Sequence, residues 1–182
     1  MAFESRFWRA EIKRDISFLE RKLSNKINFA DDVDLDKFFS TVEIKLFTIA
    51  YALRKLMETG KFPDRVSAVK LNVSQYNRNQ KRIRSWGSFD DYYDLSSQKK
   101  IKMELRFLCN QFIHARFFQP VGNSNGFMRV VYFVSDHDQQ KCVYSITIKS
   151  LLAKTRTIVD LYPKKMNVVY SESEGRDIVT SI

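Results

Sequence analysis

Residues 104–118, ELRFLCNQFIHARFF, decide the fold that the sequence predicts, because their apolar side chains recur at helical spacing on two faces. On a wheel of about 100° per residue, one face carries Ile101, Leu105, Leu108 and Phe112. The opposite face carries Met103, Phe107, Asn110, His114 and Phe118. We therefore predict a long helix here, beginning at Ser96 or Ser97 and buried on both faces.

The second apolar face of this helix requires a cover. Two covers fit the pattern: the C-terminal part of the same chain, or a second copy of the chain across a two-fold axis. We predict the homodimer, with Asn110 and His114 near the axis. The residues expected to form its interface are Met103, Phe107 and Phe118.

Two amphipathic helices are expected before this stretch, over residues 3–24 and 35–59. The first places Trp8, Ile12, Ile16, Leu19 and Leu23 at steps of three and four. The second repeats the pattern with Phe39, Val42, Leu46, Ile49, Ala50, Leu53 and Met57. Gly60 and Pro63 end the second helix, and a short strand within residues 65–73 and a loop over residues 75–96 follow.

The sequence changes in character after the GNSNG turn at residues 122–126. FMRVVYFVS (127–135) and KCVYSITIK (141–149), joined by the turn DHDQQ, predict a β-hairpin. A helix over residues 150–161, a strand at MNVVYS and a loose polar tail from Glu172 complete the chain. We therefore predict a mainly α fold: a helical bundle over residues 1–121, with an α+β appendage of residues 122–182 packed on it.

Positive charge is concentrated in the middle third of the chain. Of the formal net charge of +10, most comes from residues 61–120, which hold 12 Lys and Arg against 5 Asp and Glu. Cations that meet phosphates, beside rings that stack on bases, suit single-stranded nucleic acid; a solvated surface loop explains the same charges. The candidate contact residues are Arg78, Lys81, Arg82, Arg84 and Trp86, with Tyr76 just upstream.

Asn110 and His114 are one helical turn apart and therefore neighbours on the helix surface. Histidine can move a proton near neutral pH, and the Asn amide can orient a phosphate or a hydroxyl. The alternative is that both side chains only bond each other or the backbone inside an interface.

Cys109 and Cys142 have no disulfide or metal spacing, and we expect neither a metal nor a cofactor. His137, in the turn DHDQQ, fits a solvated turn residue.

LCNQFIHARFF, residues 108–118, is similar to the motif helix of the HEPN superfamily. These all-helical nucleotide-binding and ribonuclease domains are common in bacterial toxins and phage defence. Their signature places an Arg, then a polar residue that is often Asn, then a His: Asn110 and His114 match, whereas Cys109 stands where the Arg is expected. The resemblance implies dimerisation through the motif helices. In active members it implies metal-independent RNA cleavage, in which a 2′-hydroxyl attacks the adjacent phosphate.

Three functions remain open under this resemblance. Because the Arg is missing, we expect a catalytically weakened or inactive dimer that binds RNA or a nucleotide, in a bacterial defence or toxin–antitoxin type system. The alternative is an active endoribonuclease with His114 as general acid or base, Asn110 in a positioning role and Arg106 as the replacement cation. The further alternative is a protein–protein interaction module, for example one that binds an antitoxin, without nucleic acid.

No segment of the sequence fits a membrane anchor. The start, MAFESRFWRA, is charged and lacks an apolar core, so it does not resemble a secretory signal. The apolar run LFTIAYAL (46–53) is too short to cross a bilayer. We therefore expect a cytoplasmic protein without membrane contact.

Overall fold

The computed structural model describes residues 4–24, 32–79, 89–122, 127–173 and 175–182, which form an α+β fold. Its helices are α1 (Ser5–Ser24), α2 (Asp32–Glu58), the 3-10 turn η1 (Asp64–Val66), α3 (Phe89–Tyr92), α4 (Leu105–Ile113) and α5 (Ile148–Ile158). Its strands are β1 (Lys70–Arg78), β2 (Tyr93–Glu104), β3 (Ala115–Gly122), β4 (Met128–Ser135), β5 (Cys142–Thr147), β6 (Met166–Ser171) and β7 (Arg176–Ser181).

The two N-terminal helices are those that the apolar spacing predicts. α1 buries Ile12, Ile16 and Leu19, which pack in one core with the buried stripe of α2. At the end of α2, Gly60 has a φ of +64°, and its amide donates to the carbonyl of Met57. This left-handed conformation ends the helix and favours a residue without a Cβ atom.

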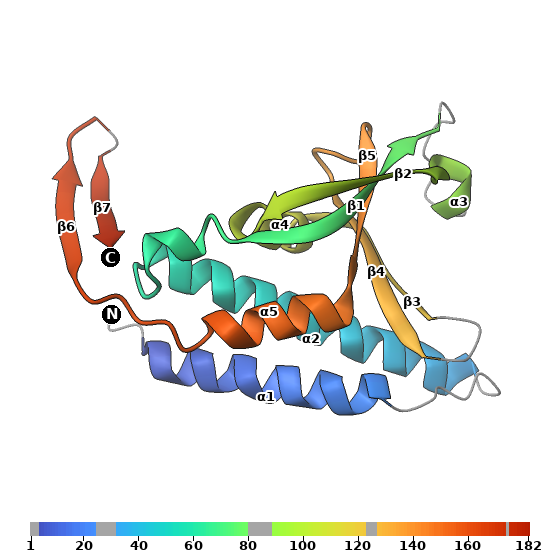
Figure 1. Ribbon diagram of the computed structural model, residues 1–182, viewed down its shortest axis with the longest axis horizontal. Helices are drawn as coiled ribbons and strands as arrows, with labels where there is room; N and C mark the ends of the chain where they lie inside the picture. The colour runs from blue at the N-terminus through green and yellow to red at the C-terminus, as the bar shows by residue number, and fades with distance from the viewer. Residues whose placement is uncertain (1–3, 25–31, 80–88, 123–126, 174) are drawn as a thin grey trace.

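Five strands form one antiparallel sheet in the order β2-β1-β5-β4-β3. The β4–β5 hairpin confirms the prediction made for FMRVVYFVS and KCVYSITIK. It pairs Val131 with Ile146 and Phe133 with Tyr144, and these four buried side chains belong to the main core. In Figure 1, β1 and β2 run across β5, β4 and β3, so the sheet is strongly twisted.

The predicted long helix over residues 97–118 is wrong, because only α4 is helical there, between strands β2 and β3. Ile101 and Met103 also fit the alternation of a strand, and they pair with Val73 and Leu71 of β1. Phe118 pairs with Phe133 of β4 in the same way. The apolar residues that a wheel assigns to a second helical face therefore belong to three elements. Strand pairing over long sequence distances, which a wheel does not represent, selects this arrangement.

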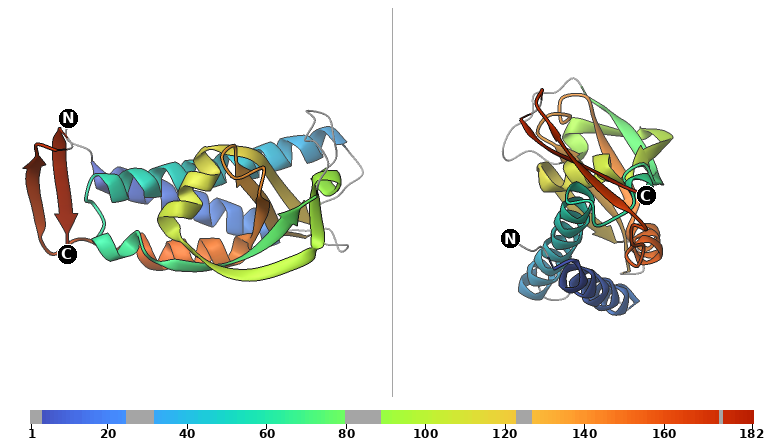
Figure 2. Two further views of the ribbon diagram at one scale, coloured as in Figure 1. Left: turned by 90° about the horizontal axis from the view of Figure 1, so that it is seen from above. Right: turned by 90° about the vertical axis from the view of Figure 1, so that its left-hand side faces the viewer.

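The mainly helical bundle is therefore also wrong: α1, α2 and α5 lie on one side of the sheet, and α4 contacts both α2 and the sheet (Figures 1 and 2). Within the expected loop over residues 75–96, β1 continues to Arg78, α3 follows at Phe89–Tyr92 and β2 begins at Tyr93, while residues 80–88 lie outside the described ranges. The expected division between residues 121 and 122 falls at the end of β3, before β4. These strands pair in one sheet, from Ala115 opposite Ser135 to Gly122 opposite Met128.

A second, smaller apolar cluster lies apart from the main core, at the end of the sheet where α3 precedes β2. Its buried members are Tyr76, Tyr92, Tyr93, Val134 and Val143. The ring of Tyr93 in β2 lies 6.0 Å from the ring of Phe117 in β3, although these are the two edge strands. The sheet therefore curls until its edges approach each other at this end.

The C-terminal residues form α5 and then a two-stranded ribbon, β6–β7, which extends from one end of the molecule (Figure 1). The predicted helix and strand are confirmed, but the tail expected to be loose forms β7. Ser181 anchors the ribbon at its base: its hydroxyl bonds the carbonyl of Phe62 and, at 3.0 Å, the carboxylate of Asp64. Val179 also packs against Gly60, where a Cβ atom would collide with it.

Arg9 joins α1 to the end of α5 from a position that is only 2% exposed. Its guanidinium donates to the carbonyl of Val159 and, at 2.5 Å, to that of Lys61. The rings of Phe62 and Tyr162 lie 4.5 and 4.0 Å from the guanidinium carbon. Burial lowers the pKa of Arg9, but an arginine remains protonated in proteins. The charge is therefore stabilised by carbonyl dipoles and aromatic faces.

Candidate nucleic-acid interface

The three residues predicted to act in catalysis lie at the two ends and on one face of α4. Arg106 is exposed in the first turn, Asn110 is half-buried, and His114 is exposed at the C-cap with φ −106°. The helix ends at Ile113. The amide of His114 donates to the carbonyl of Asn110, and the carbonyl of His114 accepts from the amide of Asp136. Among the described residues, no hydrogen bond or ion pair joins these three side chains to one another.

Asn110 has a partner that sequence reasoning missed. Its side-chain oxygen accepts a hydrogen bond from the guanidinium of Arg54 on α2, and Arg54 also contacts Glu58 at 2.7 Å. The neighbouring Cys109 is buried, and burial raises its pKa to about 12, so the thiol is neutral. The sequence signal was an arginine inside the apolar run of α2, LFTIAYALRKLM, where a cation needs a polar partner.

His137 lies in the turn between β4 and β5 and is exposed, as predicted. Its Nδ1 atom lies 3.1 Å from the carboxylate of Asp138, which also accepts from Lys141 at 3.1 Å and from Gln111 of α4 at 2.7 Å. The side-chain oxygen of Gln111, Oε1, accepts from the backbone amide of Ser135 at 2.9 Å. These hydrogen bonds connect α4 to the turn between β4 and β5, so we assign this cluster a structural role.

The residues predicted to form a dimer interface do not share one surface. Met103 is buried in the core, and Phe118 packs on Phe47 and Phe112, with ring centroids 4.6 and 5.0 Å away. Phe107 alone of the three is open, at 41% exposure. Two of the three side chains are therefore covered within the chain, and the homodimer stays a prediction.

The predicted basic loop is only partly within the described residues. Arg78 ends β1 and is half-buried, and Tyr76 is buried in the smaller apolar cluster, so its ring is not available for stacking. The remaining candidates, Lys81, Arg82, Arg84 and Trp86, lie outside the residues that the structure describes.

A cationic surface that the sequence interpretation did not single out lies on the paired strands β1 and β2. We call Lys70, Lys99, Lys100 and Lys102 the β2 lysine row; all four are exposed, three of them on β2 and Lys70 on the adjoining strand. Within the described part of the chain, none of them forms an ion pair with a carboxylate. In the sequence, polar and apolar residues alternate in KIKME, part of QKKIKME (98–104), as in a strand, and the helical interpretation overlooked this alternation.

One lysine of the row is held by a polar network on the sheet. The amino group of Lys100 donates to the hydroxyl of Ser74 at 2.8 Å, and Gln98 bonds both Ser74, at 3.0 Å, and Tyr76, at 2.9 Å. Burial alone would raise the pKa of Tyr76, but hydrogen bonds, chiefly from Ser145, outweigh burial and lower it. Burial raises the pKa of its partner Tyr132 to about 12. The hydrogen bond to Ser74 therefore positions the amino group of Lys100, and the other two N–H donors of this group remain available to a ligand.

A cavity of about 340 Å³ adjoins this row, between β2 and α4. Its apolar lining comes from Ile101, Met103, Phe107 and Tyr144, and its charged lining from Lys70, Lys102 and Glu104. The rings of Phe107 and Tyr144 meet edge to face, with their centroids 6.4 Å apart. Two lysines therefore belong to both the row and the cavity.

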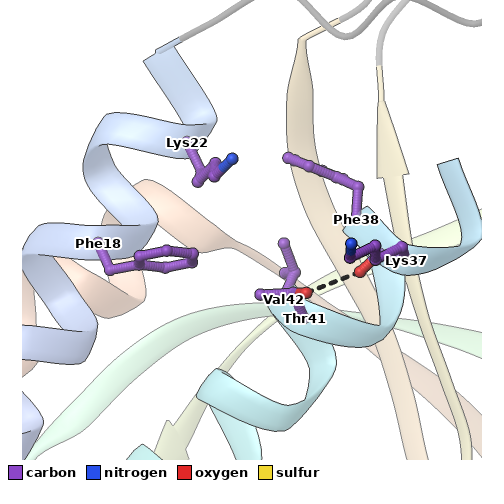
Figure 3. A pocket seen from close by; sticks show the side chains of 6 residues that line it. All are labelled: Phe18, Lys22, Lys37, Phe38, Thr41 and Val42. Atoms are coloured by element: carbon purple, nitrogen blue, oxygen red, sulfur yellow. Dashed lines mark hydrogen bonds between the residues drawn. The ribbon is translucent and has the colours of Figure 1, made fainter. Parts of the chain in front are cut away.

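A second cavity, of about 430 Å³, lies between the end of α1 and the start of α2 (Figure 3). Phe18, Lys22, Lys37 and Phe38 line it together with Thr41 and Val42, and the hydroxyl of Thr41 bonds the carbonyl of Lys37 at 2.7 Å. The residues that join α1 to α2 in the sequence, 25–31, lie outside the described ranges, so we base no function on this cavity.

Comparison of the chain with protein-family models, with curated protein sequences and with solved structures gave no match. The resemblance to HEPN domains therefore stays a prediction. Among the residues described, no helix has the length and apolar character needed to cross a bilayer. No group of three or more His, Cys, Asp or Glu side chains in the described ranges is arranged to hold a metal ion.

Proposed function

We propose that the chain binds RNA or another single-stranded nucleic acid through the β2 lysine row, without cleaving it. The observation that carries the proposal is the placement of Lys99, Lys100 and Lys102 within four residues of an edge strand, beside Lys70 and without carboxylate partners in the described part of the chain. An edge strand offers an open approach to a long polyanion. Unpaired lysines retain their charge for phosphates.

The geometry of the strand supports this use of the charges. Lys100 and Lys102 lie opposite Ser74 and Asn72 of β1 and therefore point to the same side of the sheet. Two residues along a strand are about 7 Å apart, which lets both amino groups contact one phosphate backbone. Arg78 ends the adjoining strand, and Lys81, Arg82 and Arg84 follow it in the sequence.

Fluorescence anisotropy with labelled oligonucleotides over a series of KCl concentrations tests the proposal. Replacing Lys100 and Lys102 together by Ala should weaken binding about tenfold at moderate salt, because two phosphate contacts are lost. The slope of log affinity against log salt should become shallower by about 1 to 1.5, at about 0.7 per contact for single strands.

The matched control removes two lysines from a surface outside the sheet. Lys149 and Lys154 are exposed on α5 and form no ion pair within the described residues, so their double replacement by Ala changes the net charge equally. We expect it to leave the affinity nearly unchanged. An equal loss in both double variants would show that only net charge matters, and the row would then not be the interface.

RNA cleavage is the second candidate, and the contact between Arg54 and Asn110 favours keeping it. A guanidinium beside Asn110, one turn before His114, supplies a cation that the sequence lacks at position 109. Incubating pooled RNA with the protein in EDTA and resolving it on a denaturing gel separates the two functions. Cleavage that disappears in His114→Ala would support the nuclease and contradict the binding-only proposal. A chain that neither binds nor cleaves RNA would favour a protein–protein interaction module.

A further inference from the structure

We infer that the cavity between β2 and α4 takes one unpaired nucleobase of the bound strand, which stacks on Phe107. This inference rests on the proposed function, because the β2 lysine row supplies the attraction for the backbone of that strand. Lys70 and Lys102 belong both to the row and to the lining of the cavity, so a strand held by the row passes its opening.

The lining of the cavity suits a flat aromatic ligand. Phe107 is 41% exposed in a protein whose other core aromatics are mostly buried, and Ile101, Met103 and Tyr144 complete an apolar surface around it. The edge-to-face contact between Phe107 and Tyr144 holds the Phe107 ring on one side, and the exposure of Phe107 leaves part of its ring open to a ligand. The volume of about 340 Å³ is at the small end of ligand cavities, as a single base requires.

The charges at the cavity favour a base over a phosphate. Glu104 lies opposite Lys70 in the β1–β2 ladder and lines the same cavity, so the cations there are partly offset. Burial raises the pKa of the Tyr144 hydroxyl, which therefore stays neutral. Lys100, which does not line the cavity, lies next to it along β2 on the same side of the sheet as Lys102, where a backbone would run. A base inside the cavity would contact its apolar lining, while the neighbouring phosphates would contact the lysines of the row.

Stacked bases in a duplex cannot enter such a cavity, which yields the test. Three labelled probes of equal length are compared on the full chain: a single-stranded oligonucleotide, its duplex, and a strand of abasic residues that keeps every phosphate. The wild-type chain should bind the normal strand about tenfold more tightly than the abasic strand, because stacking on one aromatic side chain contributes that much.

The variants Phe107→Ala and Phe107→Trp identify the stacking residue. Phe107→Ala should lower the affinity for the normal strand to that for the abasic strand, while leaving the salt slope and the affinity for the abasic strand unchanged. Phe107→Trp retains an aromatic face and should keep the preference for bases. Because Phe107 is open to solvent, both variants should melt near the wild-type temperature, and the comparison of probes on wild-type protein needs no variant.

Two results overturn the inference and are distinguishable. Equal affinity of the wild-type chain for normal and abasic strands, with a continued effect of the Lys100 and Lys102 replacements, would show an empty cavity and leave the proposed function intact. Absence of binding to every probe would overturn the proposed function, and the nucleobase site with it. A preference for bases that survives Phe107→Ala would place the stacking elsewhere and also overturn the inference.

Discussion

Cys109 shows how a single side chain changes what a motif can do. The position that would hold an arginine in a HEPN-like helix holds a buried, neutral thiol, which cannot replace a guanidinium at a phosphate. The guanidinium that reaches Asn110 instead comes from Arg54, 56 residues earlier in the chain. The cation beside Asn110 is therefore supplied by α2 and not by the helix that carries Asn110.

Arg9 is the residue whose removal should cost the fold most clearly. Arg9→Met retains a long apolar side chain but leaves the carbonyls of Val159 and Lys61 without their buried donor. We expect the free energy of unfolding to fall by about 2–4 kcal/mol. Urea denaturation followed by circular dichroism measures this loss.

The control for Arg9 is Arg6, a highly exposed side chain on the same helix. Arg6→Met should change the free energy of unfolding by less than about 0.5 kcal/mol. Arg9→Lys keeps a donor and should be intermediate. A small loss in Arg9→Met would mean that water satisfies the two carbonyls and that the arginine is not the link between α1 and α5.

At the scale of elements, α4 is held by contacts that a helix propensity does not reveal. Its nine residues are short for a helix that is stable alone, and its N-cap residue Glu104 makes no side-chain capping bond. Gln111 instead joins it to the β4–β5 turn, through Ser135 and Asp138. Arg54 joins it to α2. The helix therefore depends on tertiary contacts at both faces.

Asp138 gives this arrangement a pH dependence. Burial raises the pKa of its carboxyl, but hydrogen bonds from Lys141, Gln111 and His137 outweigh burial and lower the pKa below its usual value. The carboxylate therefore stabilises the fold above its unfolded pKa of about 3.9, and this stabilisation is lost as the pH falls through the lower folded pKa. Asp138→Asn should cost about 1–3 kcal/mol at pH 7, and the difference from the wild-type chain should shrink as the pH falls through the lowered folded pKa.

Urea midpoints measured from pH 7 to pH 2 check this prediction. Asp136→Asn, an exposed change in the same turn, should give the wild-type pH profile. If Asp138→Asn and the wild-type chain differ by the same amount at every pH, the carboxylate charge is not the stabilising group.

At the scale of the molecule, the main core and the β6–β7 ribbon differ in how they are covered. The core is enclosed between the helices and the sheet, whereas the ribbon stands apart from the sheet in Figure 1 and in the left view of Figure 2. Val168, Val169 and Tyr170 of β6 are 56–64% exposed. A two-stranded ribbon without a packed face has little stability of its own.

Native-state hydrogen exchange should therefore separate the two parts. Amides of β5, which pairs with β1 and β4 on both sides, should exchange only through global unfolding. Amides of β6 and β7 should exchange faster by several orders of magnitude, because the ribbon is anchored mainly at its base by Ser181 and Val179.

The concentration of protein provides the control for the exchange experiment. Ribbon amides that are as slow as those of β5, and that become faster on dilution, would contradict an isolated ribbon. They would show that a second copy of the chain covers it, and would support the predicted homodimer through a different surface.

Much of the chain could be predicted from local sequence. The apolar spacing in α1 and α2 and the alternation in the β4–β5 hairpin were sufficient, because each element shows its buried face within a few residues. The same reasoning predicted α5 and β6. Concentration of positive charge in residues 61–120 was also evident, although the lysines of β2 were assigned to a helix.

The sequence by itself determined which residues are apolar, where cations gather and where the first two helices end. Only the tertiary structure decided whether residues 97–118 form one long helix or parts of two strands on either side of a short helix. Ile101, Met103 and Phe118 satisfy both periodicities, so the choice depends on Val73, Leu71 and Phe133, which lie far away in the sequence. Local patterns cannot contain that information, because the hydrogen bonds of a sheet join distant segments.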